Sequence, residues 1–211
     1  DGGYEAEALK AAKYTLVELK NGSYKAAELG ECGFHIHELR AVQFTCLDLR
    51  KAAIFTVQMM RDGGYTATEF QKAGYDCSRV NDAGFNASEA TAAGYTVKQM
   101  YEGNYAAPDL RRAGHKAVYL REVGYTLNDL QGAGYVASEL EEAGFTPQEL
   151  KEAGTSLVQL MAAGTDVATL REAGYSVERL KKQGIPAAEL AHGGYTCKEL
   201  KQGGVTAQEL R

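Results

Sequence analysis

Residues 142–151 read Glu-Ala-Gly-Phe-Thr-Pro-Gln-Glu-Leu-Lys, and residues 152–161 repeat the pattern as Glu-Ala-Gly-Thr-Ser-Leu-Val-Gln-Leu-Met. The same unit, with the consensus Ala-Gly-(Tyr/Phe)-Thr-x-x-Glu-Leu-(Lys/Arg)-x, recurs about twenty-one times along the 211 residues. A short fixed period is the signature of a repeat architecture, in which each unit is one element that stacks on its neighbours. We therefore expect residues 1–211 to form a single repeat domain.

Each unit carries the signals that begin a helix. Thr, Ser, Asp or Asn follows the aromatic position in 14 of 21 units, and Glu, Gln or Asp often comes three residues later, as in Thr66 and Glu69. This spacing predicts a capping box, in which the two side chains satisfy each other's free backbone N–H groups. The aromatic residue before the cap and the fourth helical residue, as in Tyr125 and Leu130, have the spacing of a hydrophobic staple.

Each unit also carries the signal that ends a helix. Gly precedes the aromatic position in 16 of 21 units, and Asn104 replaces it in another; both residue types tolerate the left-handed conformation found just after a helix. About seven helical residues remain per unit, fewer than the ~12–15 that an isolated helix needs in water. The units must therefore cover one another. We predict an all-α fold, an α-solenoid of about 21 short helices, one per repeat, with a core of Leu and Ala flanked by aromatic rings.

The charges of the consensus have their own pattern. Acid lies at the third helical position and Lys or Arg follows the Leu, which matches the dipole of each helix. Stacking of the units then predicts rows of opposite charge on the outer surface. How many helices complete one superhelical turn is not set by the sequence.

The repeat changes phase by one residue at 50–54, where the segment Arg-Lys-Ala-Ala-Ile also lacks the Gly. That corner must be built differently from the others. Two interpretations are open: a tolerated bulge, or a bend or docking point in the superhelix.

The segment around Cys32, His35 and His37 brings two imidazoles and a thiol within six residues. These are zinc ligand types, but a tetrahedral site usually draws a second pair of ligands from elsewhere in the chain, and no such pair is visible. We expect exposed histidines without a metal, and keep a metal site as the alternative. The other cysteines, Cys46, Cys77 and Cys197, occupy the first helical position, where we expect small buried core residues.

A third departure from the consensus covers residues 101–121. It combines an irregular cap, a replaced aromatic residue and a local cluster of basic residues in an acidic protein. A solvated charged face is one interpretation. The other is a surface that contacts a partner, with the candidate residues Tyr101, Asn104, Arg111, Arg112, His115, Lys116, Tyr119 and Arg121.

Composition excludes several classes of function. A net charge of −5 argues against a nucleic-acid partner, which usually requires a basic surface. Apolar runs fall short of the ~18 residues of a transmembrane helix, so we expect no membrane insertion. Without a glycine-rich phosphate loop, a spaced ligand set or a Ser-His-acid constellation, the sequence predicts neither an enzyme nor a cofactor.

The consensus resembles the decapeptide tandem-repeat proteins, and the likeness runs from Gly3 to Leu210. The resemblance implies an α-helical scaffold without catalytic residues. We therefore expect a scaffold or linker that binds protein partners, as a subunit of a larger assembly. The regular last repeat predicts further chain, or a partner, beyond Arg211. A small-ligand or metal-binding repeat protein, and a structural protein that self-associates end to end, are the alternatives.

Overall fold

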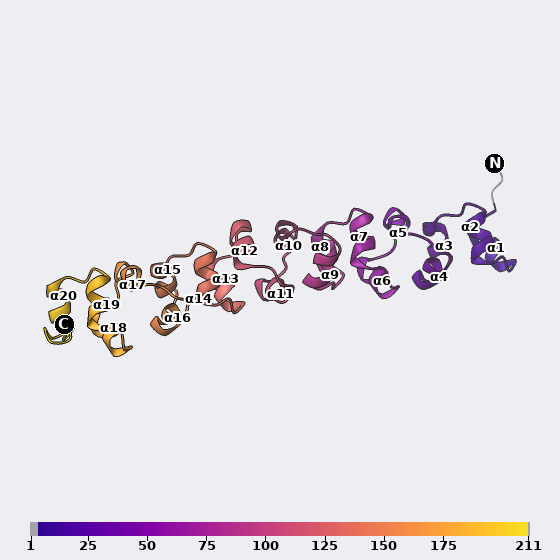
Figure 1. The fold of residues 1–211 in the computed structure, drawn as a ribbon. Coiled ribbons are helices and arrows are strands. Elements are labelled where there is room, and N and C mark those ends of the chain that lie inside the picture. Colours follow the sequence, from indigo (N-terminus) through magenta and orange to yellow (C-terminus); the bar gives the residue numbers. More distant parts are fainter. Residues whose placement is uncertain (1–3, 211) are drawn as a thin grey trace. The chain divides into compact units, whose positions relative to one another are not determined.

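The structure, a computed structural model, describes residues 4–210. These residues form short helices of six or seven residues and contain no strand (Figure 1), which confirms the predicted all-α repeat fold. Arg211, beyond which the sequence predicts further chain or a partner, lies outside the described residues. The helices are α1 (Ala6–Ala11), α2 (Leu16–Asn21), α3 (Ala26–Glu31), α4 (Ile36–Ala41), α5 (Cys46–Ala52), α6 (Val57–Asp62), α7 (Ala67–Lys72), α8 (Cys77–Asp82), α9 (Ala87–Ala92), α10 (Val97–Glu102), α11 (Ala107–Arg112), α12 (Ala117–Val123), α13 (Leu127–Gly132), α14 (Ala137–Glu142), α15 (Pro147–Glu152), α16 (Leu157–Ala162), α17 (Val167–Glu172), α18 (Val177–Lys182), α19 (Ala187–His192) and α20 (Cys197–Gln202).

The helices begin as the sequence predicts. At the start of α7, the Glu69 N–H donates to Thr66 Oγ1 at 3.3 Å, and the Thr66 N–H donates to Glu69 Oε2 at 2.7 Å. This is the predicted capping box. The last repeat keeps it between Thr206 and Glu209, although residues 207–210 form a turn rather than a helix.

The helices end in a Schellman motif. After α7, Gly74 has a φ of 76°, its N–H donates to the Gln71 carbonyl at 2.9 Å, and the Tyr75 N–H donates to the Phe70 carbonyl at 3.1 Å. The Tyr75 and Phe70 rings then meet with centroids 4.9 Å apart. The same aromatic residue therefore closes one helix and precedes the cap of the next, which is why ten residues suffice for a repeat. Asn104 takes the predicted left-handed conformation, with a φ of 59°.

The chain divides into two compact units, residues 1–113 and 114–211. Both are built in the same way: most of the closely packed helix pairs are two repeats apart. In the first unit α7 contacts α5 and α9, and in the second α17 contacts α15 and α19. Two repeats therefore make one layer, a number that the sequence left open. The single repeat domain over 1–211 stays a prediction.

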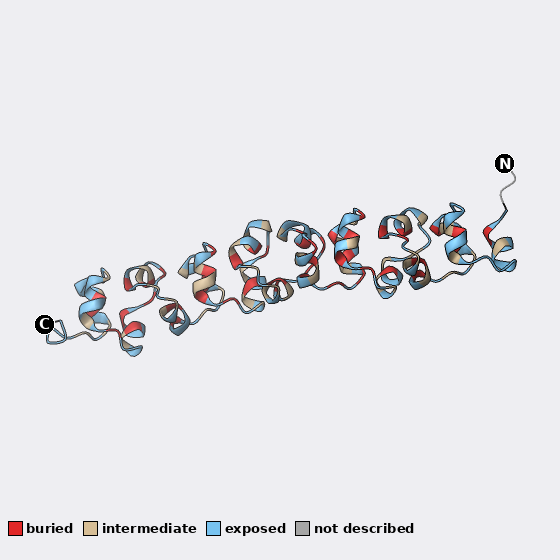
Figure 2. Cartoon of the chain, turned by 45° about the vertical axis from the view of Figure 1, so that its right-hand side comes forward, coloured by how far each residue is buried: buried red, intermediate tan, exposed pale blue. Residues whose placement is uncertain are grey.

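The core of each unit is a stripe along one side of every helix. In α7 the stripe consists of Ala67 and Phe70, followed by Ala73 just after the helix, and all three are buried. The residue at the fourth helical position, usually Leu, is fully covered in most repeats. Figure 2 shows the result, with buried and exposed residues on every helix. Each short helix is thus stabilised by the layers beside it rather than by its own backbone bonds.

The phase shift is accommodated at the corner after α5. Ala53 takes the left-handed conformation with a φ of 58°, and two residues, Ile54 and Phe55, precede the cap Thr56 where other repeats have one. Both lie against Gly30 of α3: a Cβ there would be 2.5 Å from Phe55 Cζ and 2.6 Å from Ile54 Cδ1. Gly30 occupies the position at which most repeats carry Lys or Arg, so a missing side chain in α3 makes room for the extra residue. The structure shows a local bulge, and a docking role stays a prediction.

Candidate functional site

The basic residue that follows the Leu reaches into the next layer. Lys151 Nζ donates to the Ala173 carbonyl at 2.7 Å and lies 4.7 Å from the centroid of the Tyr175 ring. Lys151 therefore binds the carbonyl at the end of the helix two repeats later and covers the ring of that repeat, two contacts that both stabilise a cation. The sequence suggested a match only to the residue's own helix. The same hydrogen bond is made by Lys10, Lys20, Arg50, Arg61 and Arg121, and Lys181 binds the Gly204 carbonyl, one residue further along.

The predicted rows of opposite charge are present between layers. Arg40 pairs with Glu69 at 3.3 Å and Arg61 with Glu89 at 3.9 Å in the first unit, and Arg171 pairs with Glu199 at 3.8 Å in the second. The basic residue is residue i, the aromatic residue is i+24 and the acidic residue is i+28. Where the phase shift lies between them, the last two are i+25 and i+29. We call these three positions the cation, ring and acid positions.

Tyrosine hydroxyls at the ring position bind the main chain of the preceding layer, as expected for buried tyrosines. Tyr105 Oη donates to the Phe85 carbonyl at 2.8 Å, and burial raises the Tyr105 pKa. The ring and its hydroxyl therefore both take part in packing, as predicted for aromatic rings that flank the core. The same bond joins Tyr24 to Tyr4, Tyr65 to Phe44, Tyr95 to Tyr75, Tyr135 to His115 and Tyr195 to Tyr175.

One kind of groove recurs along each unit. Its first wall is the corner and first turn of one repeat, and its second wall is the ring position, the acid position and the last turn of the helix two repeats later. Five such grooves have volumes of ≈ 650, 630, 550, 430 and 420 Å³; they lie within residues 131–163, 4–32, 40–73, 20–52 and 171–203. The hollows are thus products of the repeat itself, and their differences come from the residues at a few positions.

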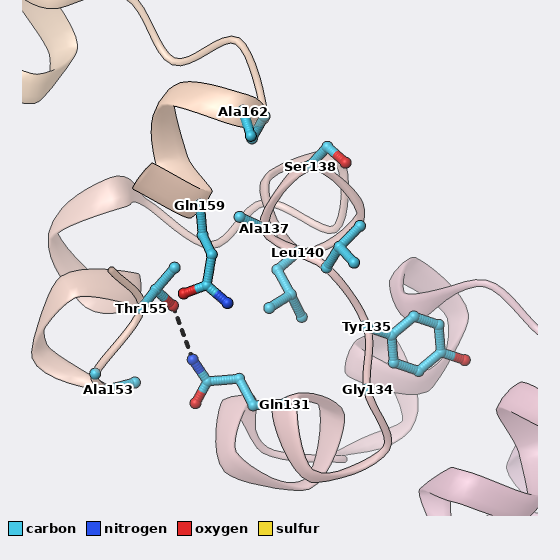
Figure 3. A pocket seen from close by; sticks show the side chains of 13 residues that line it. Gln131, Gly134, Tyr135, Ala137, Ser138, Leu140, Ala153, Thr155, Gln159 and Ala162 are labelled. Carbon is cyan, nitrogen blue, oxygen red and sulfur yellow. Dashed lines mark hydrogen bonds between the residues drawn. The ribbon is translucent and has the colours of Figure 1, made fainter. Parts of the chain in front are cut away.

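The largest of the five, within residues 131–163, differs in chemistry. The groove within 171–203 has Arg171, Tyr195 and Glu199 at the cation, ring and acid positions. The groove within 131–163 has Gln131, Thr155 and Gln159 instead, and we call it the amide groove (Figure 3).

The polar side chains of the amide groove are held in place. Gln131 Nε2 donates to Thr155 Oγ1 at 2.9 Å, and Gln159 Oε1 accepts from the Ser156 N–H at 2.9 Å and from Ser156 Oγ at 2.8 Å. Figure 3 shows Gln131, Thr155 and Gln159 converging on one side of the groove, with Leu140 beside them. This site was not predicted from the sequence; its signal there is the simultaneous departure of Gln131, Thr155 and Gln159 from the consensus, at spacings of 24 and 28 residues.

A second feature missed from the sequence is the second helical position, N2. Caps, core stripe, cation and acid lie at other helical positions, whereas N2 is mostly exposed and carries apolar, amide, charged and small residues in turn. Its occupants include Val17, His37, Leu47, Thr68, Lys98, Pro108, Asn128, Gln148, Val158, Glu178 and Lys198, all exposed. Because successive layers stack in register, these side chains form rows along each unit.

The candidate metal ligands do not come together. The His35 and His37 rings stack with centroids 5.7 Å apart, and the His35 N–H donates to Glu38 Oε2 at 2.8 Å, so His35 stands in the cap position. The Cys32 carbonyl accepts from Lys10 Nζ at 2.6 Å, and burial raises the pKa of the Cys32 thiol. Among residues 4–210, no three His, Cys, Asp or Glu side chains gather closely enough to hold a metal ion.

The prediction of buried cysteines is confirmed for Cys46 and Cys77 and wrong for Cys197, which is exposed. Burial raises the pKa of each of the two buried thiols to about 12. A residue at the first helical position is covered by the residue 26 places later: a Cβ on Gly203 would lie 2.3 Å from Val177 Cγ1.

Four of the predicted partner contacts lie in the first unit. Tyr101 and Asn104 are exposed. Arg112 forms an ion pair with Asp109, and its Nε donates to the Pro108 carbonyl at 3.4 Å. Arg111 is half-buried in the last turn of α11.

The other four lie in the second unit. Lys116 and Tyr119 are exposed, whereas burial lowers the pKa of His115. Arg121 has a structural role, since Nη1 donates to the Ala143 carbonyl at 2.6 Å and the guanidinium lies 4.1 Å from the centroid of the Phe145 ring. Contact of these eight residues with a partner stays a prediction.

The comparison with known protein families agrees with the repeat seen in the fold. The model of the decapeptide repeat region matches residues 1–54, 51–107, 84–157 and 148–211, which together span the whole chain. The chain belongs to the decapeptide repeat family. No curated protein and no solved structure matches this decapeptide repeat chain. Among the described helices of the decapeptide repeats, none is long and apolar enough to cross a membrane.

Proposed function

We propose that this decapeptide repeat protein is a non-catalytic scaffold or linker that binds protein partners as a subunit of a larger assembly. The observation that carries the proposal is the N2 position. It is exposed in most repeats and lies outside the caps, the core stripe and the cation and acid positions, and its residues differ from layer to layer. In a stacked repeat, variation of this kind gives an extended surface a pattern that a partner can recognise.

The spacing of the rows supports recognition of an extended partner. In the second unit α15 contacts α17 and α17 contacts α19, so Gln148, Ala168 and Ala188 follow one another at the separation of packed helices, about 8–10 Å. The side chains stand on layers that are already ordered. Binding to such a surface avoids the entropy cost that a flexible linker would meet.

The state of the repeated acids supports a role without catalysis. The hydrogen bonds that Glu149 accepts from the Thr146 backbone and side chain hold the pKa of Glu149 below its usual value. Glu199 has the same direction of shift for the same reason, with the Thr196 hydroxyl as the larger cause. A general acid or base works best with a pKa near the operating pH. The pKa values of these two carboxyl groups are shifted down, away from neutral pH.

The test is mild affinity isolation of the full-length protein from its native source, with quantitative mass spectrometry of everything recovered. We expect one or more proteins at near-equal stoichiometry. Recovery of the protein alone would overturn the proposal, and would favour self-assembly or a small ligand.

The role of the N2 rows needs matched variants of the same protein. Val17→Lys and Val158→Lys place one positive charge on a row in each unit, at side chains that are 54% and 57% exposed. Asn21→Lys and Gln183→Lys add the same charge at exposed positions near helix ends. We expect the first pair to reduce partner recovery and the second to leave it unchanged. Equal recovery with both pairs would remove the N2 rows from the proposal.

A further inference from the structure

We propose that the amide groove receives an uncharged aromatic side chain, Tyr or Phe, presented by a protein partner. The inference rests on the proposed function and deepens it, because it names the chemistry that a partner would bring to one place in the second unit. The groove lies between α14 and α16 and has a volume of ≈ 650 Å³.

The first argument is the absence of a ring that the repeat normally supplies. In the grooves within residues 20–52, 40–73 and 171–203, the ring position holds Phe44, Tyr65 and Tyr195. Each of these rings packs beneath a cation, at 5.0, 4.5 and 5.8 Å from the centroid respectively. In the amide groove the ring position holds Thr155. The amide groove is therefore lined by one ring, Tyr135, where each of these three grooves is lined by two.

The second argument is charge. The cation and acid positions of the amide groove carry Gln131 and Gln159, so its polar lining is neutral. A charged side chain entering it would lose hydration and gain no ion pair, which is costly. An uncharged ring loses little hydration and gains contact with the apolar part of the lining, which includes Ala137, Leu140 and Ala163.

The third argument is the orientation of Gln159. Its carbonyl oxygen is already bound by the Ser156 N–H and hydroxyl, and the amide nitrogen is directed toward the middle of the groove (Figure 3). An amide N–H in that place can donate to a phenol hydroxyl or to the face of a ring. The groove therefore offers both a polar and an apolar contact to one aromatic side chain.

The neighbouring repeat provides an internal contrast. Thr165 also replaces a ring, but there the cation position holds Glu141, and Thr165 Oγ1 donates to Glu141 Oε1 at 2.6 Å. That layer keeps a negative charge beside the site of the missing ring. A missing ring combined with a neutral lining is thus a property of the Gln131, Thr155 and Gln159 set.

The experiment is a titration of the purified full-length protein with N-acetyl-L-tyrosinamide, followed by the NMR signals of the Thr155, Ala137 and Ala163 methyl groups. We expect saturable chemical-shift changes. Two charged controls, N-acetyl-L-lysinamide and the α-amide of N-acetyl-L-glutamic acid, should not reproduce them. Because the titration needs no partner, its failure would refute the aromatic site and leave the scaffold proposal to the affinity isolation.

Two matched variants make the result specific. Thr155→Tyr restores the consensus ring in the place that the ring of the probe would take, so we expect at least a tenfold loss of affinity for the probe while the helical signals stay native. Thr165→Tyr restores the ring of the neighbouring layer and should leave the affinity within twofold. An absence of saturable shifts in the unmodified protein, or equal binding by the Thr155→Tyr variant, would overturn the proposal.

Discussion

Removal of a single hydroxyl at Tyr65 tests how the layers are held together. Tyr65 is 2% exposed, and Oη donates to the Phe44 carbonyl at 2.5 Å across one layer. Tyr65→Phe keeps the ring but deprives that carbonyl of its donor. An unpaired buried acceptor costs roughly 1–3 kcal/mol, and the ring packing is retained, so we expect a loss of about 1–2 kcal/mol.

Hydrogen exchange is the suitable assay, because stacked repeats open locally and do not unfold as one two-state body. A loss of about 1.4 kcal/mol corresponds to a roughly tenfold faster exchange of the amides that open with the layer. Tyr14→Phe is the control, since Tyr14 is 49% exposed, and we expect a change within about 0.5 kcal/mol. If Tyr65→Phe exchanges as slowly as the unmodified protein, the hydroxyl does not contribute to the coupling of the layers.

The same hydroxyl predicts a dependence on alkaline pH. Burial raises the Tyr65 pKa to about 12, above the value of about 10 for an unfolded tyrosine. The stabilisation is fully present below pH 10 and is lost as the pH rises toward 12, because the unfolded chain releases the proton first. In the Tyr65→Phe variant, the stability of the layers that contain residue 65 should depend less on pH between 10 and 12. An unchanged pH profile of exchange in that variant would contradict the assignment.

Three further predictions concern other parts of the repeat. Gly94→Ala, at a φ of 93° with open space around a Cβ, should destabilise its corner by about 1–2 kcal/mol in a hydrogen-exchange measurement through backbone strain alone; unchanged exchange rates would refute the strain. Gly30→Ala should destabilise the protein by about 1–3 kcal/mol through overpacking, and by less when Phe55→Ala is present, because Phe55 is the residue that a Cβ would meet; additive losses would refute the contact. A thiol reagent at pH 8 should label the exposed Cys197 quickly and the buried Cys46 only at the rate of local opening; equal rates would contradict the packing.

Local structure could be predicted from the sequence because its signals are local. A cap, an acid three residues later and a left-handed Gly act within one repeat. The capping box of Thr66 and Glu69 and the helix end at Gly74 could therefore be predicted without tertiary information. The buried stripe of Ala67, Phe70 and Ala73 followed in the same way from helical periodicity. The family likeness rested on these same residues.

The amide groove and the N2 rows were not predicted because they depend on which repeats touch. Gln131 and Thr155 are 24 residues apart in the sequence and form a hydrogen bond because repeats two apart pack together. That packing could not be predicted from one repeat. Contacts of this separation leave no mark within a single ten-residue unit.

By itself, the sequence determined the helices, their ends, the length of the repeat and the all-α class, because short-range backbone hydrogen bonds and side-chain caps decide these. Only the tertiary structure decided that two repeats make a layer and that a cation serves the helix two repeats later. It also decided that the grooves between layers differ in charge and in the presence of a ring. The reason is physical: a helix of six or seven residues is stabilised by its neighbours, and the choice of neighbour depends on the packing of whole layers rather than on any one repeat.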